Sequence, residues 1–230
     1  MSTQNILMNK RANLQLSSEQ RDLVNNTRWI LTKHEIIKKV YEMFGEISEM
    51  MKKEVLQNTY LFPEDLKHRG GKISKGENYQ LLPYVLLDYP SFFVKKNILT
   101  VRTMFWWGNF FSITLHLSGY QKTQFISNVP SLLSLLKESN FFICVNHEEW
   151  QHHFNEANYV LATSLTETKF NEITRQEFFK IAKKLPLSEW DNAYDFIMEG
   201  FKKIVELLQI SCQGDKKGLL PAFPTIGSDP

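Results

Sequence analysis

The sequence predicts an α+β fold with a mainly antiparallel sheet, a central β-hairpin, and amphipathic helices near the N-terminal and C-terminal ends. Three observations support this class. Apolar side chains recur at helical spacing near both ends, and two runs rich in β-branched and aromatic residues flank Gly108-Asn109. Strands and helices do not alternate regularly, which disfavours a doubly wound nucleotide-binding fold.

Two helices are expected before residue 58. Ser17 with Gln20, and Thr32 with Glu35, have the spacing of a capping box, which marks a helix start. After the second start, apolar residues follow steps of three and four and therefore share one helix face. These residues are Ile36, Val40, Phe44, Ile47, Met51 and Val55. We expect this face to pack on the core or on a partner.

Residues 58–79 are expected to form a long loop, because they contain Pro63 and three glycines and show little periodicity. A structureless connection longer than about 12 to 15 residues is usually functional or disordered. One interpretation is a lid whose basic residues, including Arg69 and Lys72, contact a phosphate or carboxylate. The alternative, which we favour, is a mobile solvated loop.

The centre of the chain predicts strands. Tyr84–Tyr89 is a short apolar run with Asp88 near its end, and Pro90 is expected to close it. The two β-rich runs that follow, 101–107 and 110–118, are separated by Gly108-Asn109. This two-residue connection suits a hairpin turn with positive φ.

If Gly108 and Asn109 are the two turn residues, Thr103 pairs with Thr114. His116 then shares a sheet face with Thr103, Phe105, Trp107, Ser112 and Thr114. This mixture of rings and hydroxyls suggests a pocket wall in which Thr103, Trp107 and Thr114 contact a ligand. The alternative is an ordinary half-buried sheet face that binds nothing.

His116 is the candidate general base on this face, with Asp88 as the carboxylate that orients it. The sequence does not place Asp88 beside His116. The alternative is a histidine that is hydrogen-bonded within the sheet and has no catalytic role.

The rest of the chain predicts short elements and then helices. The expected elements are a helix over 131–138, a strand over 141–145, a short helix capped by Asn146, a strand over 159–163, a helix from Thr174 with Glu177, and a long amphipathic helix from Ser188 with Asp191. Glycine and proline recur after Cys212. We therefore expect a flexible segment over 1–16, one α+β domain over 17–212 and an irregular tail over 213–230.

Residues 147–153 contain three histidines and two glutamates. His147 and His152 are five apart, a net rotation of about 140° on a helix, so the zinc-protease pattern fails. Glu149, His152 and His153 do have spacings of three and four, which makes them candidate metal ligands. The alternative, which we favour, is a solvated and charged helix face.

Composition excludes several classes. Lys and Arg number 27 against 25 Asp and Glu, which gives no field that indicates a nucleic-acid partner. No apolar run approaches the roughly 20 residues that cross a bilayer, and no signal peptide is recognisable, so we expect a soluble protein without a membrane partner. Only Cys144 and Cys212 are present, and Cys144 is expected in the core. A cytoplasmic location follows from this cysteine usage.

The sequence supports two main functions. The first is a small-molecule-binding or enzymatic domain with a pocket on the hairpin face near His116. The second is a non-enzymatic module that docks on a protein partner through its amphipathic helices or its C-terminal tail. A metal-dependent enzyme using Glu149, His152 and His153 is a third hypothesis. The sequence indicates no cofactor, substrate or reaction.

Overall fold

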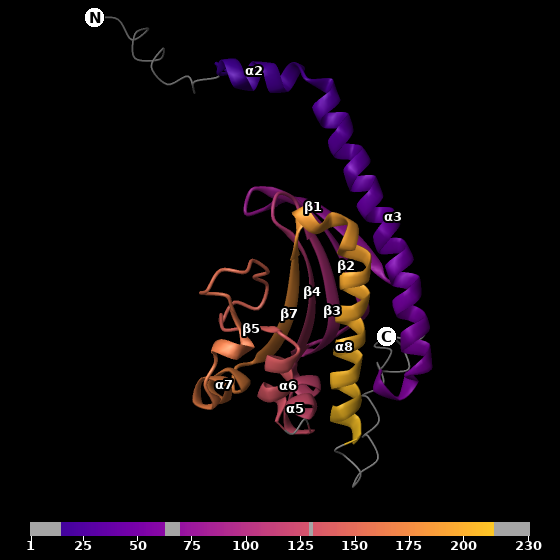
Figure 1. Cartoon of the computed structure of the whole chain (residues 1–230), viewed down its shortest axis with the longest axis vertical. Coiled ribbons are helices and arrows are strands. Elements are labelled where there is room, and N and C mark those ends of the chain that lie inside the picture. Colours follow the sequence, from indigo (N-terminus) through magenta and orange to yellow (C-terminus); the bar gives the residue numbers. More distant parts are fainter. Residues whose placement is uncertain (1–14, 63–69, 129–130, 214–230) are drawn as a thin grey trace, which may run out of the picture. The chain divides into compact units, whose positions relative to one another are not determined.

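The computed structural model (Figure 1) describes residues 15–62, 70–128 and 131–213. The predicted flexible segment 1–16 and irregular tail 213–230 lie almost wholly outside these ranges. The chain divides into one unit that ends at Lys39 and another that begins at Val40. The division falls within the range expected to be one domain, and the domain boundaries stay a prediction.

The first unit contains helix α2 (Ser18–Asn25) and the start of helix α3 (Thr27–Gln57). The predicted capping box is confirmed: Gln20 N–H donates to Ser17 Oγ at 3.1 Å, and Ser17 N–H donates to Gln20 Oε1 at 3.0 Å. These bonds satisfy amide groups that have no partner within the helix.

The predicted second start at Thr32 is wrong, because Thr32 lies inside α3. Asn26 separates the two helices, and its Oδ1 accepts a hydrogen bond from Trp29 N–H at 3.1 Å. Asparagine is among the best residues for this capping role, so the helix starts earlier than the Thr32 pattern indicated.

The second unit is built on one seven-stranded sheet in which every neighbouring pair is antiparallel, which confirms the fold class. The order across the sheet is β1-β2-β3-β4-β7-β5-β6. The strands are β1 (Lys72–Tyr79), β2 (Leu82–Val94), β3 (Asn97–Trp106), β4 (Phe110–Ser118), β5 (Phe142–Cys144), β6 (Tyr159–Leu161) and β7 (Phe178–Pro186).

Two strands occupy segments for which the sequence predicted something else. Strand β1 forms the last eight residues of the expected loop 58–79 and pairs with β2 at the sheet edge, where charged residues and glycine are tolerated. Strand β7 replaces the helix expected from Thr174: that residue instead ends α7 (Glu167–Thr174), which Thr166 caps. Pairing with β4 and β5 decides the structure of β7, and this pairing outweighs the local capping pattern.

Strand β2 does not end at Pro90 as predicted. Its pairing with β3 shifts register between Asp88 and Ser91 and then continues to Val94. A bulge accommodates proline because one residue there is left out of the hydrogen-bond ladder. The Thr100 hydroxyl donates to Pro90 O at 3.0 Å and links the bulge to β3.

The central hairpin is confirmed, but its predicted register is wrong by one residue. Trp106 pairs with Phe110, so the connection has three residues, and Gly108 has a φ of 72°. A two-residue type I′ turn needs positive φ at both central positions, and Asn109 does not have it. Each residue of β3 therefore pairs one position away from the predicted partner.

One sheet face is covered by helices. Helix α8 (Ala193–Gln213) contacts β4 and β7, and α5 (Gly119–Asn128) contacts β3, β4 and α8. Figure 1 shows α8 running along the sheet, with α5 and α6 (Leu132–Glu138) near its C-terminal end. The predicted apolar face of α3 is buried from Val40 onward.

The remaining expected elements agree with the structure except for one helix. The helix from Ser188 appears as a 3₁₀ turn (Leu187–Asn192) followed by α8, and α6, β5 and β6 lie where they were expected. The helix expected after Asn146 is absent, since residues 145–158 contain no helix or strand. Asn146 Oδ1 instead accepts from Glu148 N–H at 3.0 Å in a local turn.

Candidate functional site

A block of polar side chains lies in the middle of the sheet face that the helices do not cover. Register places Asp88, Arg102 and Thr114 in one row across three strands, and His116 and Lys180 in the next row. His116 is 3% exposed and Lys180 is 1% exposed. Buried polar groups need partners, so what covers this block determines its chemistry.

The cover is residues 145–158, which we call the covering segment. It contains no helix or strand, so its backbone groups need partners elsewhere. Lys180 Nζ supplies two of these partners, donating to Glu149 O at 2.7 Å and to Gln151 O at 2.8 Å. Burial lowers the pKa of Lys180 to about 8, although nearby Cys144 and Glu149 oppose the shift.

Tyr79, at the end of β1, is the second residue that binds the backbone of the covering segment. Its hydroxyl accepts from His152 N–H at 2.6 Å and from His153 N–H at 3.1 Å. The side chain is also 3.0 Å from His153 Nδ1, which is 2.9 Å from Gln80 Nε2. Burial raises the pKa of the Tyr79 hydroxyl. The hydroxyl therefore stays protonated near neutral pH.

Asp88 and Arg102 form a bidentate ion pair within this block of polar side chains. Arg102 Nε donates to Asp88 Oδ1 at 2.7 Å, and Nη2 donates to Oδ2 at 2.8 Å. Arg102 Nη1 is 3.1 Å from His152 Nε2. Burial and then the guanidinium charge lower the pKa of His152 to about 2. His152 is therefore neutral and accepts a hydrogen bond from Arg102.

His116 and Glu149 form the second pair, with 2.8 Å between Nε2 and Oε1. Burial, followed by the charges of Lys180 and Arg102, lowers the pKa of His116 to about 3. The imidazole is therefore neutral, and it donates its Nε2 hydrogen to the Glu149 carboxylate. Burial also raises the pKa of Glu149, with Lys180 opposing the shift. The pair is a directed hydrogen bond between a neutral donor and a carboxylate.

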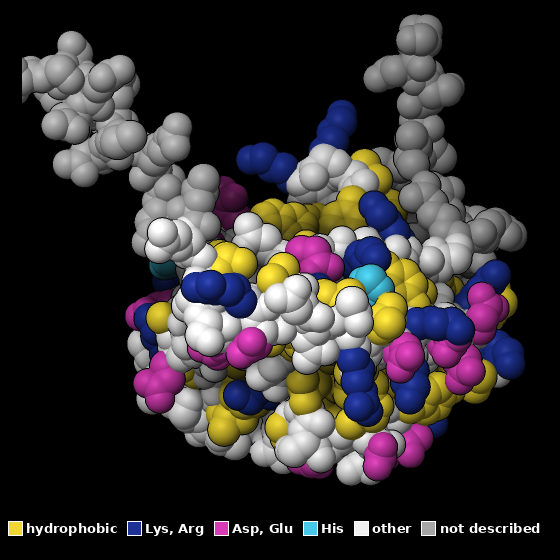
Figure 2. Space-filling model, turned by 90° about the horizontal axis from the view of Figure 1, so that it is seen from above, with side chains coloured by type: hydrophobic (Ala, Val, Ile, Leu, Met, Phe, Trp, Pro, Cys, Tyr) yellow, Lys and Arg dark blue, Asp and Glu magenta, His cyan; other side chains and the backbone are white. Residues whose placement is uncertain are grey.

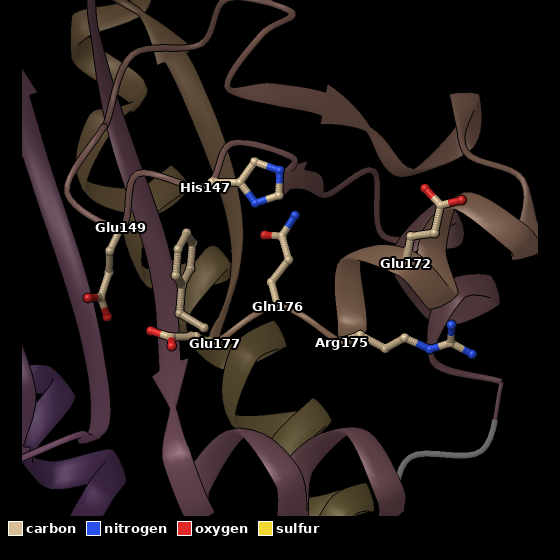
Figure 3. Close-up of a pocket in the computed structure, with 7 residues that line it drawn as sticks. His147, Glu149, Glu172, Arg175, Gln176 and Glu177 are labelled. Carbon is tan, nitrogen blue, oxygen red and sulfur yellow. The ribbon is translucent and has the colours of Figure 1, made fainter.

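Glu149 lies in the wall between two surface pockets. One pocket, of about 520 Å³, is lined by His147, Glu149, Glu172, Arg175, Gln176, Glu177 and Phe178. The other, of about 430 Å³, is lined by Lys95, Lys96, Ile98, Ser118, Gly119, Glu149, Trp150 and Glu177. In Figure 3, Glu149 and Glu177 lie toward one end of the first pocket, while Arg175 and Glu172 lie toward the other. The two pockets thus share two glutamates.

The predicted pairing of His116 with Asp88 is wrong. Asp88 binds Arg102, because β2 and β3 place these residues opposite each other. A carboxylate does contact His116, but it is Glu149 from the covering segment. His116 is buried behind Glu149 and lines neither pocket described above. With a pKa of about 3, it is not placed to act as a base toward a ligand.

Of the predicted ligand contacts on the hairpin, only Thr114 shares a face with His116. The one-residue change in register moves Thr103 and Trp107 to the other face and puts Arg102 opposite Thr114. Thr103 is fully buried there, and Trp107 packs edge-on against Phe105. The prediction that these two residues line the His116 pocket is therefore wrong.

Two basic residues of the expected 58–79 loop, Arg69 and Lys72, were predicted to contact a ligand. Arg69 lies outside the described residues. Lys72 is the first residue of β1, opposite Asp88 in the pairing with β2, so it is part of the sheet and not of a lid.

The predicted metal ligands do not come together as a helix would have arranged them. Glu149 contacts His116, His152 contacts Arg102, and His153 contacts Tyr79. Among residues 15–62, 70–128 and 131–213, no three His, Cys, Asp or Glu side chains are grouped so that they could hold a metal ion. The spacing argument failed because the segment is not helical.

Sequence reasoning missed Lys180, Tyr79 and Glu177. The run Phe178-Phe179-Lys180-Ile181 has strand composition, which could have identified β7 and with it a lysine inside a sheet. Cys144 was expected in the core and is buried there, where burial raises the pKa of its thiol.

No protein-family model matches this sequence, and neither a curated protein nor a solved structure is detectably similar to it. Within the described part of the chain, no helix combines the length and apolar character needed to cross a bilayer. On the face seen in Figure 2, basic and acidic side chains are interspersed. The expectation of no nucleic-acid partner stays a prediction.

Proposed function

We propose that this protein binds a small organic cation, an amine or a guanidine, at Glu149. The observation that carries the proposal is the position of this carboxylate. It is fixed by His116 Nε2 at 2.8 Å and is shared by two pockets. Pockets of roughly 300 to 1,000 Å³ with a few placed polar groups are typical of small-molecule sites.

In the pocket that contains Phe178, three glutamates outnumber one arginine, Arg175, which favours a cation over an anion. In the other pocket, Lys95 and Lys96 balance the two glutamates. Glu149 and Glu177 belong to both pockets, and a cation between them would gain charge-assisted hydrogen bonds. Phe178 in one pocket and Trp150 in the other supply apolar surface for the ligand's carbon atoms. Trp150 is 48% exposed, so its ring is accessible to a ligand.

His116 acts in this proposal as a positioning residue. Its neutral imidazole holds one oxygen of Glu149 and leaves the other for the ligand. The raised pKa of Glu149 also makes it a better proton acceptor than an ordinary glutamate. If the bound ligand is a substrate, the general base is therefore Glu149, and not His116 as the sequence suggested.

The test is calorimetric titration of the full chain with butylamine, putrescine and agmatine, with the corresponding alcohols as uncharged controls. We expect the amines to bind and the alcohols to bind more weakly. Glu149→Gln should weaken amine binding about tenfold to hundredfold, because it removes a charge-assisted hydrogen bond. Glu156→Gln is the matched control, since Glu156 is exposed on the same segment and lines neither of the two pockets.

Two results would contradict the proposal. One is equal binding of amines and alcohols, and the other is unchanged amine binding in Glu149→Gln. His116→Gln should weaken binding less than Glu149→Gln, because it loosens the carboxylate without removing its charge. Acidification should weaken amine binding at a pH above the usual glutamate range, since the pKa of Glu149 is raised.

We also propose the cytoplasm as the location of the protein. Cys144 is a free and buried thiol, which suits a reducing compartment. Cell fractionation with detection of the full chain tests this location, and recovery in a secreted fraction would contradict it.

A further inference from the structure

The pocket of about 430 Å³ beside Glu149, which we call the lysine pocket, is lined by charges of both signs. Glu149 and Glu177 line it together with Lys95 and Lys96, the two residues that connect β2 to β3. In the part of the chain that the structure describes, neither lysine side chain forms an ion pair. Both ammonium groups can therefore meet a ligand.

The acidic side of the lysine pocket is fixed in place. Glu149 Oε1 is 2.8 Å from His116 Nε2. Burial raises the pKa of Glu149; Lys180 opposes this shift, and the charge of Glu177 adds to it. The two carboxylates are thus close enough to repel each other, and Figure 3 shows them at the same end of the neighbouring pocket. A cation between them relieves this repulsion.

The basic side is also held by the fold. Ser118 Oγ donates to Lys96 O at 2.6 Å, and Tyr120 N–H, in the first turn of α5, donates to Asn97 Oδ1 at 2.8 Å. The start of a helix favours a nearby anion. Lys95 has a φ of 54°, which glycine or asparagine adopts at lower cost, so the turn itself does not require a lysine there. What the lysine adds is positive charge beside the pocket.

The two sides are separated by a short stretch of strand. Thr100 pairs with His116, Ile98 is two residues along β3 from Thr100, and Lys96 is two residues further. At about 3.3 Å per residue, the row of His116 lies about 13 Å along the strand from Lys96. The glutamate and lysine side chains extend into this interval, since both line the pocket. Ile98 and Trp150 line it as well and can contact the carbon atoms of a ligand.

We propose that the lysine pocket binds a small zwitterion, a molecule that carries an ammonium group and an oxyanion joined by a short carbon chain. The ammonium group binds Glu149 and Glu177, and the oxyanion, a carboxylate or a phosphate, binds Lys95 and Lys96. This proposal rests on the cation site at Glu149 and adds a second recognition group to it. Every charge lining the lysine pocket then has a partner of opposite sign.

The test is calorimetric titration of the full chain with pairs of ligands that differ only in the oxyanion. Butylamine is compared with δ-aminovalerate, which is butylamine with a carboxylate added, and ethanolamine with phosphoethanolamine. We expect the zwitterion to bind about threefold to tenfold more tightly than its amine, because ion pairs with exposed lysines are individually weak. The preference should shrink at high salt, since exposed charges are screened. γ-Aminobutyrate and ε-aminocaproate then measure which charge separation fits best.

Substitutions separate the two recognition groups. Lys95→Gln with Lys96→Gln should abolish the preference for the zwitterion and leave butylamine binding intact, whereas Glu149→Gln should weaken both ligands. Lys75→Gln is the matched control, since Lys75 is exposed on β1 and lines neither pocket. Arg175→Gln tests the neighbouring pocket and should keep the preference. Thermal melts check that each variant is folded.

The outcomes distinguish this proposal from the cation site on which it rests. If butylamine binds and neither zwitterion binds more tightly than its amine, the zwitterion proposal fails and the cation site stands. Loss of the preference in Arg175→Gln but not in the double lysine variant places the oxyanion in the neighbouring pocket and overturns the assignment. Absence of binding by every amine and every zwitterion overturns both proposals. A preference in only one ligand pair, lost in the double lysine variant, supports the proposal and identifies the oxyanion.

Discussion

Asp88→Ala should destabilise the protein, because it leaves the buried guanidinium of Arg102 without its ion-pair partner. Both side chains of the Asp88–Arg102 pair are mostly buried, at 10% and 14% exposed, and two hydrogen bonds of 2.7 and 2.8 Å join them. Removing one member of a buried pair costs about 3 to 5 kcal/mol. Arg102 keeps its contact with His152 and has some exposure, so we expect about 3 kcal/mol.

A double-mutant cycle isolates this effect. Arg102→Met leaves the Asp88 carboxylate unpaired and should cost a similar amount, whereas the double variant leaves neither charge buried. We expect the double variant to lose less than the two single variants together, with a coupling energy of about 2 kcal/mol or more. Urea unfolding followed by tryptophan fluorescence measures each free energy of unfolding. A loss below about 1 kcal/mol for Asp88→Ala, or simple additivity, would refute the buried-pair reasoning.

Two further predictions concern buried histidines and glycine packing. Because burial lowers the pKa values of His116 and His152 from 6.5 to about 3 and about 2, the unfolded chain binds protons that the folded chain does not. The free energy of unfolding should therefore fall as pH drops below about 6.5 toward 3, by about 1.4 kcal/mol per pH unit for each histidine. His152→Gln should remove one of these contributions, and identical pH slopes for variant and wild type would count against it. A Cβ on Gly200 of α8 would lie 2.7 Å from Ile113 Cγ2 in the core, so Gly200→Ala should lose about 1 to 2 kcal/mol despite its higher helix propensity. Gly45→Ala in α3, where a Cβ meets nothing within 4 Å, is the control and should gain up to about 1 kcal/mol; the same sign for both in thermal melts would exclude the packing argument.

Elements with strong local patterns were predictable from the sequence. The apolar periodicity of α3 and α8 and the β-rich runs on either side of Gly108 are properties of neighbouring residues, and all three appear in the structure. The exact register of the hairpin was not predictable in the same way. It depended on Asn109 keeping a negative φ, which the sequence Gly108-Asn109 does not specify.

The candidate site was harder to predict because its contacts are distant in sequence. Lys180 meets Glu149 across 31 positions, and Tyr79 meets His152 across 73. The Thr174-x-x-Glu177 pattern is a sound local helix signal, yet pairing of β7 with β4 outweighs it. His116 was predicted as a pocket-lining base oriented by Asp88, but its carboxylate partner is Glu149, and that contact depends on how the covering segment folds.

The anchors of the covering segment bind mainly to backbone atoms, which every amino acid has apart from the N–H that proline lacks. Lys180 donates to two backbone carbonyl groups, and Tyr79 accepts from two backbone amides. Such recognition does not depend on the side chains at the anchored positions. The segment can therefore change its outward-facing side chains while keeping its path over the sheet, which makes it a scaffold on which binding preferences can be altered by substitution or design.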